Sequence, residues 1–310
     1  MYDDYERLLA KVAALYYVDD VPQNVIAQQL GLSKSKVCRM LAEAKRRGIV
    51  RATVYTTHEY SDLEREFEKR YNLREAIIVS SDTDPMAEIG TAGAEYLRRV
   101  VREGDIIGVS WGRTLLSVAE KLSPLRVDNV SVVQLVGGLD TQMNQLQSSK
   151  LAMQFAMACG CTAQLLYCPA KAPTQEVMSG LMLDPVINRV FQMGRRATIA
   201  LVGIGAMVAS GELFRNGYIP YETLHNLKEG GAVGDVCMRF YDENGQETAN
   251  TLGPLTMSIP LEDLKKIPNV VCLAAGKEKG DAILGALKGG IAKTFITDKA
   301  TADFILTLDR

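Results

Sequence analysis

The chain has 310 residues, of which 47% are apolar and 23% charged, and 35 Lys and Arg nearly balance 37 Asp and Glu. This composition is that of an ordinary globular protein, and it excludes an intrinsically disordered chain, a collagen and a disulfide-rich miniprotein. The length favours two domains. A net charge of −2 argues against a nucleic-acid partner only if the charge is evenly spread along the chain.

Three helical patterns occupy the first 50 residues. Apolar residues on one face predict a helix over 3–18. A second helix is expected to begin at Pro22 and to end at Gly31, and a third is expected to be capped by Ser33 and to end at Gly48. A short helix, a tight turn with glycine and a second helix form the helix-turn-helix pattern.

The basic residues are concentrated in this part of the chain. Residues 1–57 carry a net charge of +3, residues 33–51 alone carry +6, and the remaining 253 residues carry −5. A basic stripe on a nearly neutral chain is typical of a DNA-binding module, although a solvated face of an ordinary three-helix bundle is the alternative. Residues 49–56 alternate apolar and polar and predict a wing. We expect double-stranded DNA to be contacted by Gln23, Ser33, Lys34, Ser35, Lys36, Arg39 and Arg51.

Residues 58–75 predict a charged linker helix with one narrow apolar stripe, formed by Leu63, Phe67 and Tyr71. Ser61 and Glu64 have the spacing of a capping box. Such a stripe can dock on the following domain or pair with another subunit, and the sequence leaves both possibilities open.

From residue 76 onward, apolar runs alternate with helical stretches such as 86–103, 113–122 and 145–159. The runs are continuous rather than alternating, which is typical of strands that are buried on both faces. This order predicts a Rossmann-like parallel α/β sheet wound on both sides. The expected strands are 76–80, 105–110, 130–136, 163–168, 197–203, 270–275 and 294–297.

Ligands of such sheets bind at the carboxyl ends of the strands. The strand expected at 105–110 is followed by a turn with Ser110, Gly112, Arg113 and Thr114, and a helix is expected to begin there. The free N–H groups at the start of this helix and the guanidinium of Arg113 suit an anion. Together with later strand ends, these residues predict a site for a phosphorylated sugar or polyol. The other expected site residues are Gly137, Gly138, Asn144, Gly205, Asp235 in a flexible glycine-rich loop, and Lys279.

Several other classes of chemistry find no support in the sequence. The chain has two histidines, no GxSxG motif, no GxGxxG or P-loop motif, and six cysteines without a CxxC pair. We therefore expect no catalytic residues, no metal and no cofactor. The absence of a signal peptide and of an 18-residue apolar stretch predicts a cytoplasmic protein without a membrane partner.

The chain resembles the SorC family of bacterial transcriptional regulators over nearly its whole length. The motifs that carry the resemblance are GVSWGRT (108–114), QLVGG (134–138), LVGIG (201–205), GAVGD (231–235), AAGKEKGDAILGALKGG (274–290) and FITDKATA (295–302). The resemblance implies an effector domain similar to ribose-5-phosphate isomerase and glucosamine-6-phosphate deaminase. It also implies homodimers or homotetramers and control of carbohydrate or nucleoside catabolic operons.

The resemblance also assigns roles to residues of the effector site. It implies that the 110–114 turn cradles phosphate, that Gly137 and Gly138 line the pocket, and that Asp235 contacts sugar hydroxyls. It further implies that Lys279 meets the effector or its phosphate. Some members carry a lysine just before the paired glycines and bind an aldehyde covalently; Val136 stands there in this chain, so reversible binding is expected.

Taken together, these features predict three parts: a winged helix-turn-helix at 1–57, a linker helix at 58–75, and an effector and oligomerisation domain at 76–310. The function expected is a regulator, with a repressor favoured over an activator, whose operator affinity responds to a sugar phosphate. The alternatives are a sugar-phosphate isomerase or deaminase with an appended DNA-binding module, and a DNA-binding protein without an effector.

Overall fold

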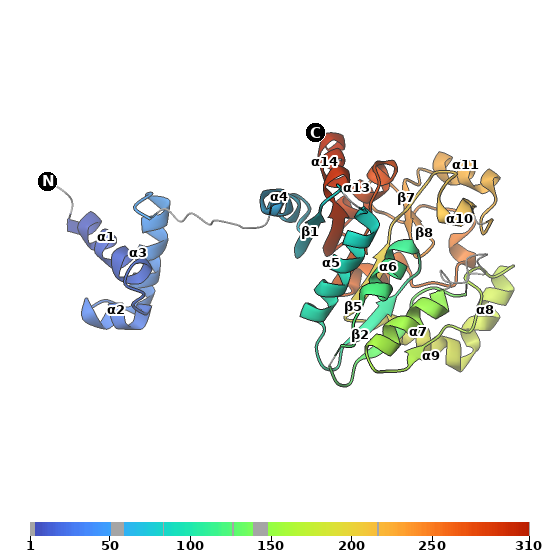
Figure 1. Ribbon diagram of the computed structural model, residues 1–310, viewed down its shortest axis with the longest axis horizontal. Coiled ribbons are helices and arrows are strands. Elements are labelled where there is room, and N and C mark those ends of the chain that lie inside the picture. The colour runs from blue at the N-terminus through green and yellow to red at the C-terminus, as the bar shows by residue number, and fades with distance from the viewer. Residues whose placement is uncertain are drawn as a thin grey trace. The chain divides into compact units, whose positions relative to one another are not determined.

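The computed structural model describes residues 4–50, 59–82, 84–125, 127–138, 148–215 and 217–309 (Figure 1). The chain divides into two compact units, residues 1–59 and 60–310. No helix in the described part of the chain is both long and apolar enough to cross a bilayer.

The first unit is a three-helix bundle that contains the helix-turn-helix. Its helices are α1 (Asp4–Tyr17), α2 (Gln23–Gln29) and α3 (Lys34–Arg46). Gly31 turns the chain between α2 and α3 with φ of +63°, a backbone conformation that glycine adopts without strain. Ser33 caps α3 as expected, since its Oγ accepts a hydrogen bond from Lys36 N at 3.2 Å. The small core is formed by Leu9, Val12, Ile26, Ala27, Val37, Met40 and Leu41. The helix-turn-helix prediction is confirmed, while most of the expected wing lies outside the described residues.

The second unit is built on a seven-stranded parallel sheet with the order β1-β10-β9-β5-β2-β3-β4. Its strands are β1 (Glu75–Val79), β2 (Ile106–Val109), β3 (Ser131–Gln134), β4 (Ala163–Gln164), β5 (Ile199–Gly203), β9 (Asn269–Leu273) and β10 (Thr294–Asp298). All seven strands expected from the apolar runs are present, and all pair in parallel.

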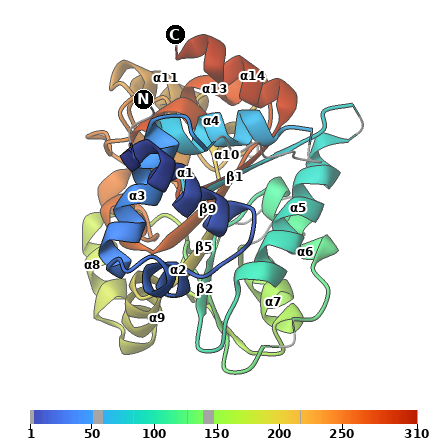
Figure 2. The ribbon, with the colours of Figure 1, turned by 90° about the vertical axis from the view of Figure 1, so that its left-hand side faces the viewer.

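Helices cover both faces of this sheet, so the prediction of a doubly wound α/β domain is confirmed. Because successive strand residues point to opposite faces, Ile199 and Leu201 join one core while Ala200 and Val202 join the other. Figure 2 shows the two helical layers. The first layer contains α5 (Pro85–Val100), α6 (Arg113–Lys121) and α7 (Ser148–Ala158). The second contains α4 (Ser61–Tyr71), α9 (Pro185–Arg195), α13 (Gly280–Lys288) and α14 (Lys299–Leu308).

Short elements complete the unit at its periphery. They are α8 (Gln175–Leu183), α10 (Glu212–Arg215), α11 (Tyr221–Glu229), α12 (Leu261–Lys266), and the 3-10 turns η2 (Gly253–Leu255) and η3 (Lys277–Lys279).

Helix α4 docks on its own unit rather than presenting its apolar stripe to another subunit. Phe67 is fully buried and stacks on Phe295 of β10, with ring centroids 6.2 Å apart. Tyr71 OH donates to Asp309 Oδ2 at 2.9 Å, beyond the end of α14. Of the two possibilities that the sequence left open, the structure therefore selects docking.

The expected capping box of α4 is wrong. Tyr60 holds the N-cap position instead of Ser61. Glu64 Oε1 accepts from Ile78 N at 2.9 Å, and Glu68 Oε1 accepts from Ala76 N at 3.1 Å. Both amides belong to β1, which is an edge strand of the large sheet in the part of the chain that the structure describes. The glutamates thus pair N–H groups that would otherwise be open to another chain.

Truncation of Phe67 tests how firmly α4 is docked. We expect Phe67→Ala to lower the free energy of unfolding of the second unit by about 3–5 kcal/mol, because it leaves a cavity against the sheet. Glu66→Ala, an exposed site on the same helix, should change it by less than about 0.5 kcal/mol. Urea unfolding measures both, and equal midpoints for the two variants would contradict the docking of α4.

A small antiparallel sheet lies at the periphery of the large one. It consists of β6 (Gly205–Ala206), β7 (Gly234–Val236) and β8 (Arg239–Tyr241). Cys237 and Met238 form the two-residue turn between β7 and β8, and both have positive φ. The placement of Asp235 in a flexible loop is wrong: it lies in β7, pairs with Gly205 and Phe240, and is only 6% exposed.

Candidate functional site

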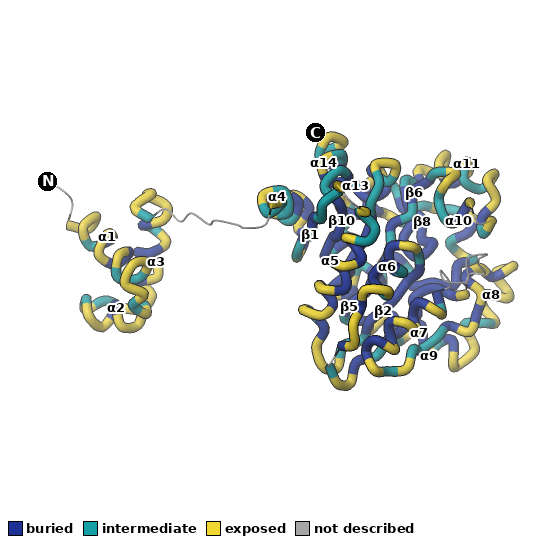
Figure 3. The backbone as a smooth tube through the Cα atoms, in the orientation of Figure 1, coloured by how far each residue is buried: buried dark blue, intermediate teal, exposed yellow. Residues whose placement is uncertain are grey.

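The candidate nucleic-acid interface is the exposed face of α3. Lys34, Lys36 and Arg39 are all exposed, while the opposite face of the helix is buried in the core (Figure 3). Among the described residues, neither Lys34 nor Lys36 forms an ion pair. The basic side chains at the other end of α3 differ, because Arg47 pairs with Glu43 at 2.5 Å. Glu43 thus offsets part of the positive charge at the end of α3, while its first two turns present three exposed basic side chains.

The other residues expected to contact DNA differ in their positions and hydrogen bonds. Ser33 Oγ holds the start of α3 and also lies 3.1 Å from Ser35 Oγ. Arg39 Nε donates to Ser35 O at 3.4 Å, which directs its guanidinium back along the helix. Gln23 is the first residue of α2 and is partly exposed. Arg51 lies outside the described residues.

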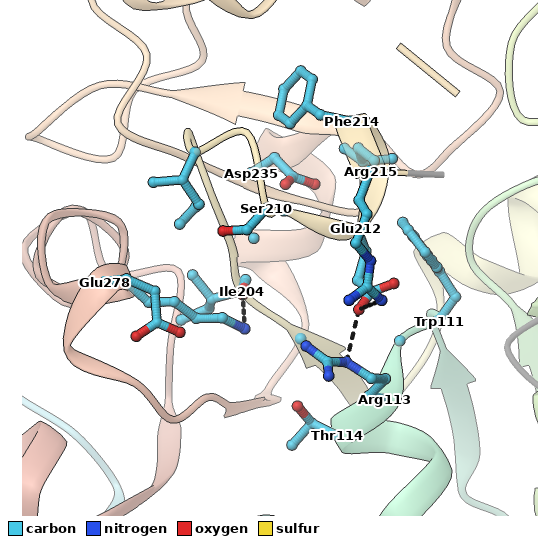
Figure 4. A pocket seen from close by; sticks show the side chains of 18 of the residues that line it. Trp111, Arg113, Thr114, Ile204, Ser210, Glu212, Phe214, Arg215, Asp235 and Glu278 are labelled. Atoms are coloured by element: carbon cyan, nitrogen blue, oxygen red, sulfur yellow. Dashed lines mark hydrogen bonds and ion pairs between the residues drawn. The ribbon is translucent and has the colours of Figure 1, made fainter. Parts of the chain in front are cut away.

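The candidate effector site is an open cavity of about 290 Å³ in the second unit (Figure 4). It lies at the carboxyl ends of β2, β5 and β9, three neighbouring strands of the large sheet. The chain runs from β2 outward to β4 and then returns to β5 on the other side of β2. The cavity is therefore at the point where the winding direction reverses, the usual ligand site of open α/β sheets.

One wall of the cavity suits an anion. Helix α6 begins here after Gly112, whose φ of +124° a residue with a side chain rarely adopts. The first N–H groups of a helix lack partners within the helix and carry partial positive charge. Ser110 is buried at the end of β2, and Thr114 lies in the first turn of α6. Arg113 adds a guanidinium to this wall.

Another part of the lining carries a buried acid, Asp235, and a partly buried base, Lys279. Burial raises the pKa of Asp235 to about 6, against the effects of Met238 N, which donates to its Oδ2 at 3.1 Å, and of the nearby Lys279. Burial likewise lowers the pKa of Lys279, whose Nζ donates to Ile204 O at 2.9 Å. An acidic and a basic hydrogen-bonding group thus line the same cavity as the start of α6.

Comparisons with known proteins agree with this geometry. Residues 55–307 match the family model Sugar-bind, which describes a sugar-binding domain. The deoxyribonucleoside regulator of Bacillus subtilis is 35% identical and covers 96% of both chains. The sorbitol operon regulator of Klebsiella pneumoniae is 30% identical over 97% of this chain and 98% of that one. Its full-length crystal structure, SorC, superposes with a TM-score of 0.76 over 98% of this chain and 100% of that one, at 30% identity. The chain belongs to the SorC family of transcriptional regulators.

Most of the effector-site residues expected from the sequence line the cavity of this SorC-family chain. These are Ser110, Gly112, Arg113, Thr114, Gly205, Asp235 and Lys279. Asn144 lies outside the described residues. These residues come from four segments that are separate in the sequence, as expected if the carboxyl ends of neighbouring parallel strands meet at one edge of the sheet.

Gly137 and Gly138 are not among the described residues that line the cavity. A Cβ atom on Gly137 would lie 2.6 Å from Pro169 O, so this position requires glycine for packing. Gly138 N donates to Cys168 O at 2.8 Å, and Ala170 N donates back to Gly138 O at the same distance. In the structure, these two glycines let their backbone pack closely against the backbone of residues 168–170. Their contact with an effector stays a prediction.

The sequence analysis missed the segment after β6, which contributes Ser210, Glu212, Phe214 and Arg215 to the cavity. Glu212 Oε1 lies 2.7 Å from Arg113 Nε and 2.9 Å from Arg215 Nη2. The signal that could have found this segment is the charged ELFR motif, which follows the glycine turn at the end of β5 by several residues.

The raised pKa of Asp235 predicts a pH-dependent stability. Below its ordinary pKa of 3.8 the protonated form stabilises the fold fully, and this stabilisation is lost as the pH rises through about 6. Relative to Asp235→Asn, the wild-type free energy of unfolding should fall by about 2–3 kcal/mol between these limits. Urea unfolding of both proteins from about pH 4.5 to 7.5 measures this difference. Parallel pH profiles would contradict the perturbed titration.

Proposed function

We propose that this transcriptional regulator binds operator DNA through α3 and that a phosphorylated sugar or polyol, bound reversibly in the cavity, controls its operator affinity. The observation that carries the proposal is the cavity itself, which combines a helix N-terminus and Arg113 with a polar wall formed by Asp235 and Lys279. Phosphate suits the first wall. Sugar hydroxyls suit the second, because it offers both a donor and an acceptor.

The names of the two relatives suggest the kind of operon that is controlled. One is named for deoxyribonucleosides and the other for sorbitol. We propose that this chain represses a carbohydrate or nucleoside catabolic operon and is released from DNA when the phosphorylated substrate of that pathway accumulates. A change in operator affinity of about 5–150-fold would require a coupling of about 1–3 kcal/mol.

We further propose that the protein is a homodimer or homotetramer, because helix-turn-helix regulators usually read two half-sites related by a two-fold axis. The stripe on α4 is already used within the subunit, so the interface must lie elsewhere. Exposed apolar side chains in and beside α7, α8 and α9 suit it, among them Met157, Tyr167 and Leu183. Light scattering measures the mass, and a monomer at micromolar concentration would contradict this part of the proposal.

An enzyme is the second candidate, because the cavity holds an acid and a base with shifted pKa values, Asp235 and Lys279. Both groups already hold the fold together, through Met238 N and Ile204 O. We therefore propose that the protein does not turn its effector over. Conversion of a pentose or hexose phosphate by the purified protein, lost in Asp235→Asn, would reverse this assignment.

A thermal-shift panel tests the effector class. Phosphorylated pentoses, hexoses and polyols are compared with their unphosphorylated counterparts, and a ligand present at 100 times its Kd should stabilise the fold by about 2.7 kcal/mol. Trp111, the sole tryptophan of the chain, lines the cavity and offers an independent fluorescence signal. If only unphosphorylated compounds stabilise the protein, the phosphate assignment is wrong.

A further inference from the structure

Glu212 is paired with the two guanidinium groups that a bound phosphate is expected to contact. Its Oε1 accepts from Arg113 Nε at 2.7 Å and from Arg215 Nη2 at 2.9 Å. Figure 4 shows Glu212 and Arg113 pointing toward one another in the cavity. A single carboxylate oxygen thus holds two guanidinium groups, in the manner of a bound anion.

Exposure distinguishes the acid from the two cations. The side chain of Glu212 is 18% exposed, whereas those of Arg113 and Arg215 are 54% and 45% exposed. The carboxylate is therefore largely removed from water and depends on the arginines for its charge compensation. The arginines lose less by changing partner, since solvent reaches both.

The charges around the cavity balance formally. Among the described residues, three basic side chains line it, and so do three acidic ones: Arg113, Arg215 and Lys279 against Glu212, Asp235 and Glu278. If a phosphate dianion enters this cavity, its best hydrogen-bond donors, Arg113 and Arg215, are already paired with the carboxylate of Glu212. Like charges sharing one site destabilise each other. Binding of the dianion is therefore favoured if Glu212 leaves the arginines.

The backbone of α10 is well placed to keep its position during such an exchange. Leu213 and Phe214 follow Glu212 and are buried at 4% and 2% exposure, so they anchor the short helix in the core. Glu212 itself can rotate about its side-chain bonds without unfolding α10. An anion-for-anion exchange thus requires only a local rearrangement at the mouth of the cavity.

We propose that Glu212 is an internal competitor of the effector's phosphate group: its carboxylate holds Arg113 and Arg215 in the free protein, and phosphate replaces it there. This inference rests on the proposed phosphorylated effector. Glu212 is then a specificity-determining residue, because only an anionic ligand forms new ion pairs with the arginines that compensate for the two ion pairs lost by Glu212. An unphosphorylated polyol leaves them intact.

The test compares Glu212→Gln with the wild type in the full-length chain, using inorganic phosphate as the probe and glycerol as the uncharged comparison. Glutamine keeps the size of the side chain but removes its charge. We expect Glu212→Gln to bind phosphate at least 10-fold more tightly, measured from the phosphate dependence of the melting temperature. Its response to glycerol should change by less than 2-fold.

Glu278→Gln provides the matched comparison, because it removes the same charge from the same cavity without touching the arginine pair. The proposal requires that Glu212→Gln binds inorganic phosphate about 10-fold more tightly than Glu278→Gln does. Adding Arg113→Met to Glu212→Gln should abolish this gain in phosphate affinity. If the wild type binds phosphate and Glu212→Gln binds it equally or more weakly, the inference is wrong while the proposed function stands. If neither protein binds any phosphate compound but both bind polyols, the proposed function itself fails.

Discussion

Replacement of Lys34, Lys36 and Arg39 by alanine is expected to lower operator affinity about 100-fold at physiological salt. These side chains are exposed on α3, and the two lysines have no acidic partner among the described residues. Each phosphate contact that is lost removes about 0.9 from the slope of log affinity against log salt concentration. The slope should therefore fall by about 2–3, which fluorescence anisotropy with labelled operator DNA at several salt concentrations measures.

The matched control removes the same charge from the second unit. Lys69, Lys121 and Lys228 are exposed on α4, α6 and α11, and their triple alanine variant should retain operator affinity within about 2-fold. If both triple variants weaken binding equally, net charge rather than α3 governs DNA binding. Full affinity in the α3 variant would mean that another surface reads the operator.

Arg113→Met is expected to weaken strongly the response to a phosphorylated effector while leaving operator affinity without effector unchanged. A charge-assisted hydrogen bond to phosphate contributes about 2–3 kcal/mol, so effector affinity should fall about 30–150-fold. Helix α6 retains its N–H groups in this variant, so a residual response at high effector concentration is expected. Thermal shift gives the effector affinity, and operator binding with and without effector gives the response.

Arg98→Met is the control for Arg113→Met, because Arg98 is exposed on α5 and donates to Ser123 Oγ outside the cavity. This variant should respond to effector as the wild type does. An undiminished response in Arg113→Met would exclude Arg113 from phosphate binding and would leave the α6 N-terminus, Arg215 and Lys279 as the remaining donors.

The strands of the large sheet could be recognised from the sequence because both of their faces are buried. A run such as 270–275 is continuously apolar, since alternate side chains enter the two cores on either side of the sheet. The small sheet escaped notice because β6, β7 and β8 have only two or three residues each. Such short strands carry no measurable periodicity, so the sequence predicts a loop around Asp235.

The sequence points to the residues that line the cavity where they follow a strand closely, and it does not point to those where the chain returns to the cavity later. Arg113 follows β2 by four residues, and the rule that ligands bind at strand ends was sufficient to select it. Glu212 and Arg215 enter the cavity only after β6 and a turn, so their position depends on how that connection folds back. Gly137 satisfied the same rule as Arg113, yet its surroundings give it a packing role.

By itself, the sequence determined the helix-turn-helix, the basic stripe on α3, the parallel α/β class and the turn at 110–114 that lines the cavity. These features are local, because capping, periodicity and glycine turns act over a few neighbouring residues. Only the tertiary structure decided that α4 docks on its own sheet, that Asp235 and Lys279 line one cavity, and that Glu212 pairs with two arginines. Each of these depends on segments far apart in the chain, and burial and ion pairing arise only when packing brings such segments together.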